Sequence, residues 1–134
     1  MAETFLLEIV TPSRKLLSKE VDEVIAPGFN GEFGVLPGHT QFLTVLKPGE
    51  ITFKKGSETE SYAVGRGYAE VLPDKTTVLV DTAESKGEID IDKAKKTLAE
   101  AEEALKTLAP EDAEYAAATD AYELAAARIK VKEK

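Results

Sequence analysis

Several residue types that build metal, disulfide and catalytic sites are scarce or missing in this chain. It contains no cysteine, which excludes disulfide bonds and thiolate metal sites. It contains a single histidine, His39, so a histidine metal cluster is excluded. No apolar run approaches the roughly 18 residues that a membrane-spanning helix needs, and residues 1–10 lack the regions of a signal peptide. These absences predict a soluble, intracellular protein without a bound metal.

Positive charge and catalytic motifs are also scarce. The chain has 17 Lys and Arg residues against 25 Asp and Glu, a net charge of −8, which argues against nucleic-acid binding. The carboxylates are spread evenly, and His39 lies in a predicted turn. The glycines of residues 31–34 lack phosphate-loop spacing, and Gly65-Arg66-Gly67 instead predicts a tight bend. We therefore predict an interaction protein, not an enzyme.

The composition changes at Gly87. Eight of the nine glycines, five of the six prolines and every phenylalanine precede it, whereas residues 88–134 hold thirteen alanines and one proline. Glycine and proline are typical of turns, and alanine is the strongest helix former. The sequence therefore predicts a strand-rich domain over residues 1–86 and a helical domain over residues 87–134.

Short alternating runs separated by turn residues fill the first domain. In the first run Phe5, Leu7 and Ile9 share one face. Turn signals at residues 55–57 and 73–75 indicate hairpins. No crossover helix is present to support a parallel sheet. We predict an all-β N-terminal sandwich with strands at residues 4–10, 21–25, 31–36, 41–46, 51–54, 61–64, 68–72 and 76–80.

Two helices with coiled-coil spacing are predicted in the second domain. Asp90 is placed to cap the first, and Pro110 fits the first turn of the second, so the simplest arrangement is a C-terminal antiparallel two-helix hairpin. Four of the eleven seam positions are alanine, which buries little apolar area, so a partner with an apolar surface can open the hairpin. The seam positions are Ile91, Ala94, Leu98, Ala101, Leu105 and Leu108 in the first helix, and Tyr115, Ala118, Tyr122, Ala125 and Ile129 in the second.

Five motifs together resemble the epsilon subunit of F-type, proton-translocating ATP synthases of bacteria. They are V-T-P-S at residues 10–13, G-E-F-G-V-L-P-G-H at 31–39, G-R-G-Y-A-E-V at 65–71, T-T-V-L-V-D-T-A-E at 76–84 and I-D-I-D-K-A-K at 89–95. They occur in order over essentially the whole chain. The second motif is the most specific, whereas alanine-rich helices alone would not identify a family.

The resemblance implies a non-catalytic rotor subunit of the central stalk. Its sandwich would bind the gamma subunit and rest on the ring of c subunits, so that proton-driven rotation reaches the catalytic head. Glu32 and His39 would then be polar contacts to the c-ring. The chain would be a monomer when isolated, and would reach the cytoplasmic face of the bacterial inner membrane only as part of the complex.

The resemblance also assigns the hairpin to regulation. Extended along gamma it would oppose ATP hydrolysis, and folded it would permit hydrolysis. Clustered positive charge at the C-terminal end of the second helix suits the helix dipole. In the extended state these side chains, Arg128, Lys130 and Lys132, would meet acidic groups of the beta and alpha subunits.

Some bacterial relatives bind ATP at the folded hairpin through a motif resembling I-D-x-x-R-A. In this chain Lys93 stands where that motif has arginine, and a lysine ammonium lacks the planar fork of donors that holds a phosphate. The carboxylate of Asp92, beside Lys93, would repel the phosphates of ATP. We therefore expect any ATP binding to be weak, with no other cofactor. The residues matching that site are Glu84, Asp90, Lys93 and Arg128.

Two other functions fit the same composition. The chain would serve as a free-standing sandwich adaptor if its helical tail formed a coiled-coil dimer. It would serve as an ATP-sensing, small-ligand-binding domain if a pocket lay between the sandwich and the hairpin. Co-elution of a monomer with a gamma subunit would reject the first, and a thermal shift with ATP but none with gamma would favour the second.

Overall fold

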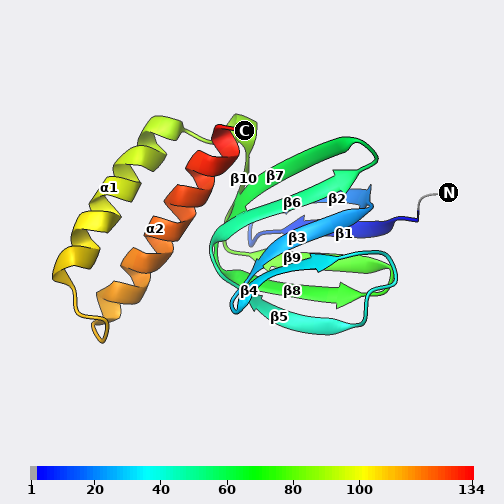
Figure 1. Ribbon diagram of the computed structural model, residues 1–134, viewed down its shortest axis with the longest axis horizontal. Helices are drawn as coiled ribbons and strands as arrows, with labels where there is room; N and C mark the ends of the chain where they lie inside the picture. The colour runs from blue at the N-terminus through cyan, green and yellow to red at the C-terminus, as the bar shows by residue number, and fades with distance from the viewer. Residues whose placement is uncertain (1–2) are drawn as a thin grey trace.

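Ten strands precede a short 3-10 turn and two helices in the computed structural model, which describes residues 3–134 (Figure 1). All eight expected strands coincide with or overlap observed ones, and two more were not expected: β2, and the short β10. The strands are β1 (Phe5–Val10), β2 (Lys15–Val21), β3 (Glu23–Gly28), β4 (Gly31–Val35), β5 (Phe42–Leu46), β6 (Gly49–Lys55), β7 (Glu58–Val64), β8 (Gly67–Leu72), β9 (Lys75–Val80) and β10 (Ala83–Ser85). They are followed by η1 (Lys86–Glu88), α1 (Ile91–Thr107) and α2 (Ala113–Lys132).

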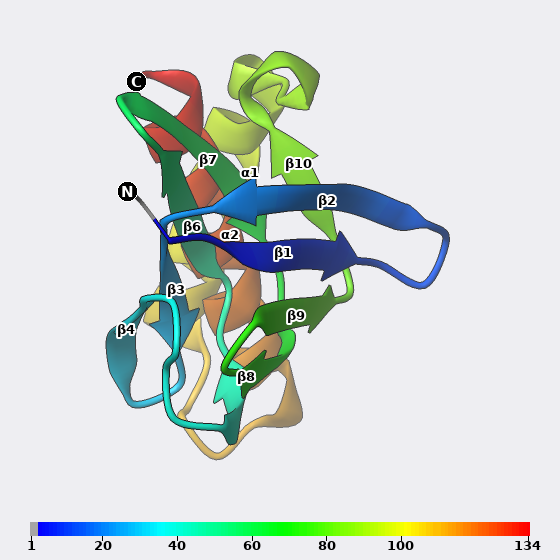
Figure 2. The same ribbon diagram turned by 90° about the vertical axis from the view of Figure 1, so that its right-hand side faces the viewer.

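The strands form one hydrogen-bonded path, β10-β7-β6-β3-β5-β8-β9-β1-β2, with β4 beside β3. A single residue pair, Gly28 with Leu46, joins β3 to β5. The path folds there into two layers, β10-β7-β6-β3-β4 and β5-β8-β9-β1-β2. In Figure 2, β1 and β2 of one layer run across the direction of β6 and β7 of the other, and the helices lie behind the strands. The predicted sandwich is confirmed.

One pair of strands is parallel, contrary to expectation. β1 pairs with β9 in parallel register, from Leu6 opposite Lys75 to Val10 opposite Leu79. The expectation assumed that a parallel pair needs a crossover helix. Here the connection from β1 to β9 instead runs through all the strands between them.

Apolar side chains at alternate positions of the strands form the core of the sandwich. Phe5, Leu7 and Ile9 on β1 are buried, as predicted from their spacing. They pack among buried side chains from both layers, such as Phe53 on β6 and Val71 on β8. The hydrophobic core is therefore complete within the strands and does not include the helices.

The two helices form the expected antiparallel hairpin. Asp90 caps α1, because its Oδ1 accepts a hydrogen bond from the Lys93 backbone N–H at 3.1 Å. Pro110 was misplaced by the prediction. It lies in the connecting turn, closed by the Asp112 N–H donating to the Ala109 carbonyl, and α2 begins only at Ala113. Proline suits the second position of such a turn as well as a first helical turn.

The predicted seam is confirmed, and α2 has a second packed face. Seam residues Ala94, Ala101 and Ala125 are buried, and the other seam residues are at least half-buried. α2 lies between α1 and the sandwich (Figure 1), with contacts to β6 and β7. Its second face contributes to a small apolar cluster separate from the main core. That cluster comprises Ala63, Ile89, Ala127 and Val131, with Leu124 packed against it.

Candidate functional site

The segment with the most specific motif, residues 31–39, runs along β4 and into a turn. Glu32 is exposed at the start of β4, where it lines a hollow of about 350 Å³ between the sandwich and α2. His39 is half-buried at the other end, with Nδ1 2.7 Å from the Thr40 carbonyl oxygen and its ring 5.2 Å from that of Phe42. Between them the Leu36 side chain is 58% exposed. The structure thus places Glu32 and His39 at opposite ends of one segment, not in a single cluster.

The four residues matched to an ATP site do meet at one place. Glu84, Asp90, Lys93 and Arg128 line one hollow, together with Ala94. Its volume is about 60 Å³, far below the roughly 300 Å³ at which small-molecule pockets begin. Two of its charged groups are already engaged, because the Arg128 Nε donates to the Glu84 carboxylate. The folded hairpin therefore brings these residues together without enclosing a nucleotide-sized space.

The cations at the end of α2 face the sandwich. Arg128 pairs with Glu84, and the Lys130 Nζ lies 3.4 Å from the Glu50 Oε1. The Lys132 Nζ donates to the Lys86 carbonyl oxygen at 3.1 Å. The sequence identified these cations but not the acidic side chains that they meet. In the folded hairpin they do not form a free basic tip.

Glu50 on β6 receives two of these charges. The Lys134 ammonium contacts its Oε2, opposite the Lys130 contact, and the carboxylate side chain is only 10% exposed. Burial acts to raise the pKa of Glu50, but hydrogen bonds from Lys134 and Ser61 and the charges of both lysines lower it below its ordinary value. The carboxylate is therefore charged in this arrangement.

A further ion pair joins the sandwich to the middle of α2. Arg66 lies in the bend between β7 and β8 that the sequence predicted. Its Nε and a terminal guanidinium nitrogen each donate to one carboxylate oxygen of Asp120, both at 2.9 Å. The charge of Asp120 and its hydrogen bonds raise the pKa of Arg66. This bidentate geometry is stronger and more directional than a single contact. Sequence reasoning missed the pair, because the motif around Arg66 does not indicate a partner 54 residues away.

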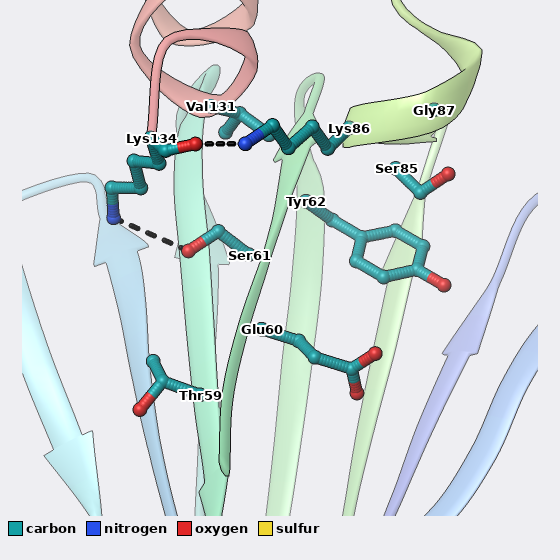
Figure 3. Close-up of a pocket in the computed structure, with 9 residues that line it drawn as sticks. All are labelled: Thr59, Glu60, Ser61, Tyr62, Ser85, Lys86, Gly87, Val131 and Lys134. Carbon is teal, nitrogen blue, oxygen red and sulfur yellow. Dashed lines mark hydrogen bonds between the residues drawn. The ribbon is translucent and has the colours of Figure 1, made fainter.

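A hollow of about 560 Å³ lies where β7, η1 and the end of α2 meet (Figure 3). The Lys134 Nζ donates to the Ser61 Oγ at 3.2 Å, and the Lys86 Nζ donates to the Lys134 carbonyl oxygen. Glu60, also on its wall, pairs with Lys19. The two lysines are thus held by a hydroxyl and a backbone carbonyl on the wall of the hollow, and Glu60 is held by Lys19 outside it. The full lining is Thr59, Glu60, Ser61, Tyr62, Ser85, Lys86, Gly87, Val131 and Lys134.

An exposed apolar face is the other surface that the sequence did not identify. Val45 on β5 is opposite Tyr68 on β8, which is opposite Leu79 on β9, so the three share one face. Leu43 extends the row along β5, and the Phe29 N–H donates to the Val45 carbonyl beside it. Their exposures are 60% for Phe29, 69% for Leu43, 41% for Val45, 55% for Tyr68 and 45% for Leu79. We call these five residues the outer apolar face.

Hollows lie on both sides of Tyr68 in this face. One of about 340 Å³ includes Phe29 and Leu43, and one of about 410 Å³ includes Leu79 and Arg66. Apolar patches of this kind mark interaction sites in soluble proteins. A signal existed in the sequence, because residues 42–46 read Phe-Leu-Thr-Val-Leu and are apolar in both phases of a strand. A strand with one face in the core needs only one apolar phase.

Two kinds of site are absent from residues 3–134. Across residues 3–134, no helix is long and apolar enough to span a membrane. The same part of the chain holds no group of three or more His, Cys, Asp or Glu side chains arranged to bind a metal ion.

Comparison with known proteins gives matches over both parts of the chain. The family model for the ATP synthase Delta/Epsilon chain beta-sandwich domain matches residues 4–86, and that for its long alpha-helix domain matches residues 88–133. The ATP synthase epsilon chain of Geobacter metallireducens is 53% identical over 131 residues, 98% of this chain and 95% of the relative. That of Geotalea uraniireducens is 52% identical over 134 residues, covering 100% and 97%.

Solved structures share the fold. A chain of the Euglena gracilis mitochondrial ATP synthase, in a structure of OSCP, F1 and the c-ring, aligns with a TM-score of 0.79 at 24% identity. The alignment covers 98% of this chain and 82% of that one. A chain of the central stalk and c-ring of the Tetrahymena thermophila enzyme aligns with a TM-score of 0.64 at 15% identity, covering 98% and 95%.

Proposed function

The chain belongs to the ATP synthase delta/epsilon family, and we propose that it works as the epsilon subunit of the central stalk, coupling proton-driven rotation to ATP synthesis. The observation that carries this proposal is the 53% identity to an epsilon chain along 98% of the sequence. A rotor subunit needs surfaces that bind its neighbours firmly and needs no reacting groups. The outer apolar face and the charged hairpin are surfaces of that kind.

The outer apolar face is the proposed docking surface for the gamma subunit. Its five large side chains are 41–69% exposed, and burying one such side chain contributes about 1.5–3 kcal/mol. The face lies on β5, β8 and β9, in the layer that does not pack on α2. A helical rotor shaft with an apolar side would therefore reach it while the hairpin stays folded.

The proposed c-ring contact is the segment from Glu32 to His39. Exposed Leu36 supplies an apolar tip, and Glu32 and His39 supply polar groups at its two ends. Through gamma and the c-ring the chain would sit at the cytoplasmic face of the bacterial inner membrane. We expect a monomer in isolation, because the helical seam that would support a coiled-coil dimer is filled within the chain.

The proposed regulatory element is the hairpin. When it extends toward the catalytic head, Arg128, Lys130 and Lys132 would meet acidic groups of the beta and alpha subunits and oppose ATP hydrolysis. Individual exposed ion pairs contribute about 1 kcal/mol or less, so several must act together. Support comes from the position of these cations, which face carboxylates and carbonyls that they can leave without breaking the core.

Add-back to a depleted enzyme tests the coupling role. Purified chain added to ATP synthase lacking its epsilon subunit, in sealed vesicles, should restore proton-driven ATP synthesis. The double variant Glu32→Gln and His39→Ala should bind gamma normally yet restore less synthesis. Glu58→Gln with Thr59→Ala, at exposed positions of β7, is the matched control. No restoration by the parental chain would refute the proposal.

ATP binding is a second candidate activity, favoured by the grouping of Glu84, Asp90, Lys93 and Arg128 around one hollow. Its small volume and the lysine at position 93 predict weak affinity. Replacing Lys93→Arg should strengthen ATP binding in a calorimetric titration, whereas Lys96→Arg, at an exposed position of the same helix, should not. Equal, undetectable binding by all three proteins would reject this activity.

A further inference from the structure

The interface between α2 and the sandwich is largely polar. Its apolar part is the small cluster around Ala63 and Ile89, in which three of the five side chains are Ala or Val. Ion pairs surround this cluster along the helix. From the start of α2 toward its end they are Asp120 with Arg66, Arg128 with Glu84, and Lys130 with Glu50, which also meets Lys134. We call these contacts the latch pairs.

In each latch pair the sandwich supplies the charge opposite to the one on the helical segment. The sandwich offers a cation to the one acidic position of α2 in the set, and carboxylates to the basic end of the helix. A helix shifted by one turn would lose these matches. The latch pairs therefore define one docked position of the hairpin, which the alanine-rich apolar contact alone would define poorly.

Arg66 is held in place by the glycines that flank it. A side chain at Gly67 would overlap the Leu79 carbonyl oxygen, and one at Gly65 would overlap the Asp81 carboxylate. The close approach of the two segments fixes the bend at Arg66, where the Gly65 N–H donates to the Thr82 carbonyl at 2.9 Å. The motif Gly65-Arg66-Gly67 thereby presents a guanidinium to α2.

The carboxylates of the latch pairs would compete with the catalytic head for the cations of α2. Glu50 and Glu84 hold the same cations that the proposed regulatory contact needs. Arg128 and Lys130 cannot pair with the sandwich and with a distant partner at once. Removing the sandwich carboxylates and removing the cations should therefore have opposite effects on inhibition.

We propose that Glu50, Glu84 and Arg66 form an electrostatic latch that holds the hairpin folded and keeps its cations from the catalytic head. This inference rests on the proposed epsilon role and adds which residues set the resting state. Because surface ion pairs are individually weak, the latch is easily reversed. A weak latch suits a switch that partners must be able to open.

Opening can be measured on the full chain by itself. The chain has no cysteine, so Lys55→Cys and Glu114→Cys give two exposed labelling sites, one on the sandwich and one on α2. Pulsed EPR between spin labels should show one narrow distance distribution, and Glu50→Gln with Glu84→Gln should raise the population at other distances about tenfold. Glu100→Gln with Glu102→Gln removes the same charge from exposed positions of α1 that join no ion pair within residues 3–134.

Exchanging the charges of Arg66 and Asp120 distinguishes loss of their attraction from local disruption of the structure. Arg66→Asp and Asp120→Arg should each increase the open population, and the two together should restore the single narrow distance distribution. If the exchange does not restore it, or if Glu50→Gln with Glu84→Gln behaves like the control, the latch is refuted. Gamma binding, measured on the same proteins, reports separately on the proposed function.

The sign of the effect on hydrolysis completes the test. In the assembled enzyme, Glu50→Gln with Glu84→Gln should lower ATP hydrolysis about threefold or more, because released cations favour the inhibitory state. Neutralising Arg128, Lys130 and Lys132 to glutamine should raise it. An open hairpin with an unchanged hydrolysis rate would overturn the regulatory part of the latch. A change of the same sign in both variants would overturn the competition.

Discussion

Glu8 shows how the sandwich accommodates charge within a strand. Its side chain, 10% exposed on β1, meets the Lys15 Nζ at 2.7 Å and the Lys75 Nζ at 2.9 Å. Hydrogen bonds from these two lysines lower the pKa of Glu8, and the same contact raises the pKa of Lys75. A carboxylate in such a position is stable only while paired. Glu8 therefore ties β1 to its neighbours on both sides.

Acid should weaken the fold through Glu8 and Glu50. The pKa of each is below its ordinary value of 4.5 in the folded chain, so the unfolded chain binds protons more readily. Their contribution to stability is present above about pH 4.5 and is lost as the pH falls through the folded pKa values. Urea denaturation from pH 6 to pH 3 should show this loss, with a shallower decline in Glu8→Gln with Glu50→Gln. An equal decline in both proteins would contradict it.

Gly67 should tolerate no side chain. A Cβ there would overlap the Leu79 carbonyl oxygen, which is backbone and cannot rotate away. Gly67→Ala should lower the free energy of unfolding by about 1–3 kcal/mol, as overpacking does. Gly87→Ala is the control, because nothing lies within 4 Å of a Cβ built there and its φ is not positive. Equal melting temperatures for the two variants would show that the β8–β9 approach is looser than described.

At the scale of elements, the strands and the helices have separate hydrophobic cores. The main core draws only on β1 to β9, with Ala83 of β10 packed against it, whereas α2 meets the sandwich through a small second cluster. Ion pairs supply the rest of that contact. This division would allow the proposed opening of the hairpin while the sandwich stays folded.

A fragment ending at Lys86 tests this division. It retains the whole main core, so we expect cooperative unfolding and gamma binding like those of the full chain, with loss of the helical circular-dichroism signal. The cut exposes Ala63, which α2 normally covers, and a methyl group of this size changes stability by about 1 kcal/mol at most. Broad, non-cooperative unfolding of the fragment would mean that sandwich and hairpin form one obligate core.

The local sequence pattern predicted most of the strands and both helices. It failed for features that depend on contacts between residues far apart in sequence. Alternation found β1, and heptad spacing found the seam of α1 and α2. β2 was missed because its burial is irregular, with exposed Lys15 and Ser18 among half-buried leucines. The parallel β1–β9 pair, the partners of the α2 cations and the Arg66–Asp120 pair join residues far apart in sequence. No local period encodes such contacts.

At the scale of the whole molecule, the chain presents two surfaces of opposite chemistry. The outer apolar face lies on β5, β8 and β9, and the polar interface of α2 lies against β6 and β7 of the other layer. We interpret the first as the permanent attachment and the second as the reversible one. Burial of large apolar side chains gives a contact that salt does not weaken, whereas ion pairs are screened beyond about 8–10 Å at physiological salt.

The central claim is that the outer apolar face attaches the chain to gamma, and the affinity for purified gamma tests it most directly. Mixing the two should give a one-to-one complex in size-exclusion chromatography with light scattering. Leu43→Glu with Leu79→Glu should weaken binding about a hundredfold or more, since two apolar contacts are lost. Ser57→Glu with Thr59→Glu, which adds the same charge at exposed positions of the β6–β7 hairpin, should bind like the parental chain. If the parental chain and gamma elute separately, or if the Leu43 and Leu79 variant binds as tightly as the control, the outer apolar face does not attach the chain to gamma.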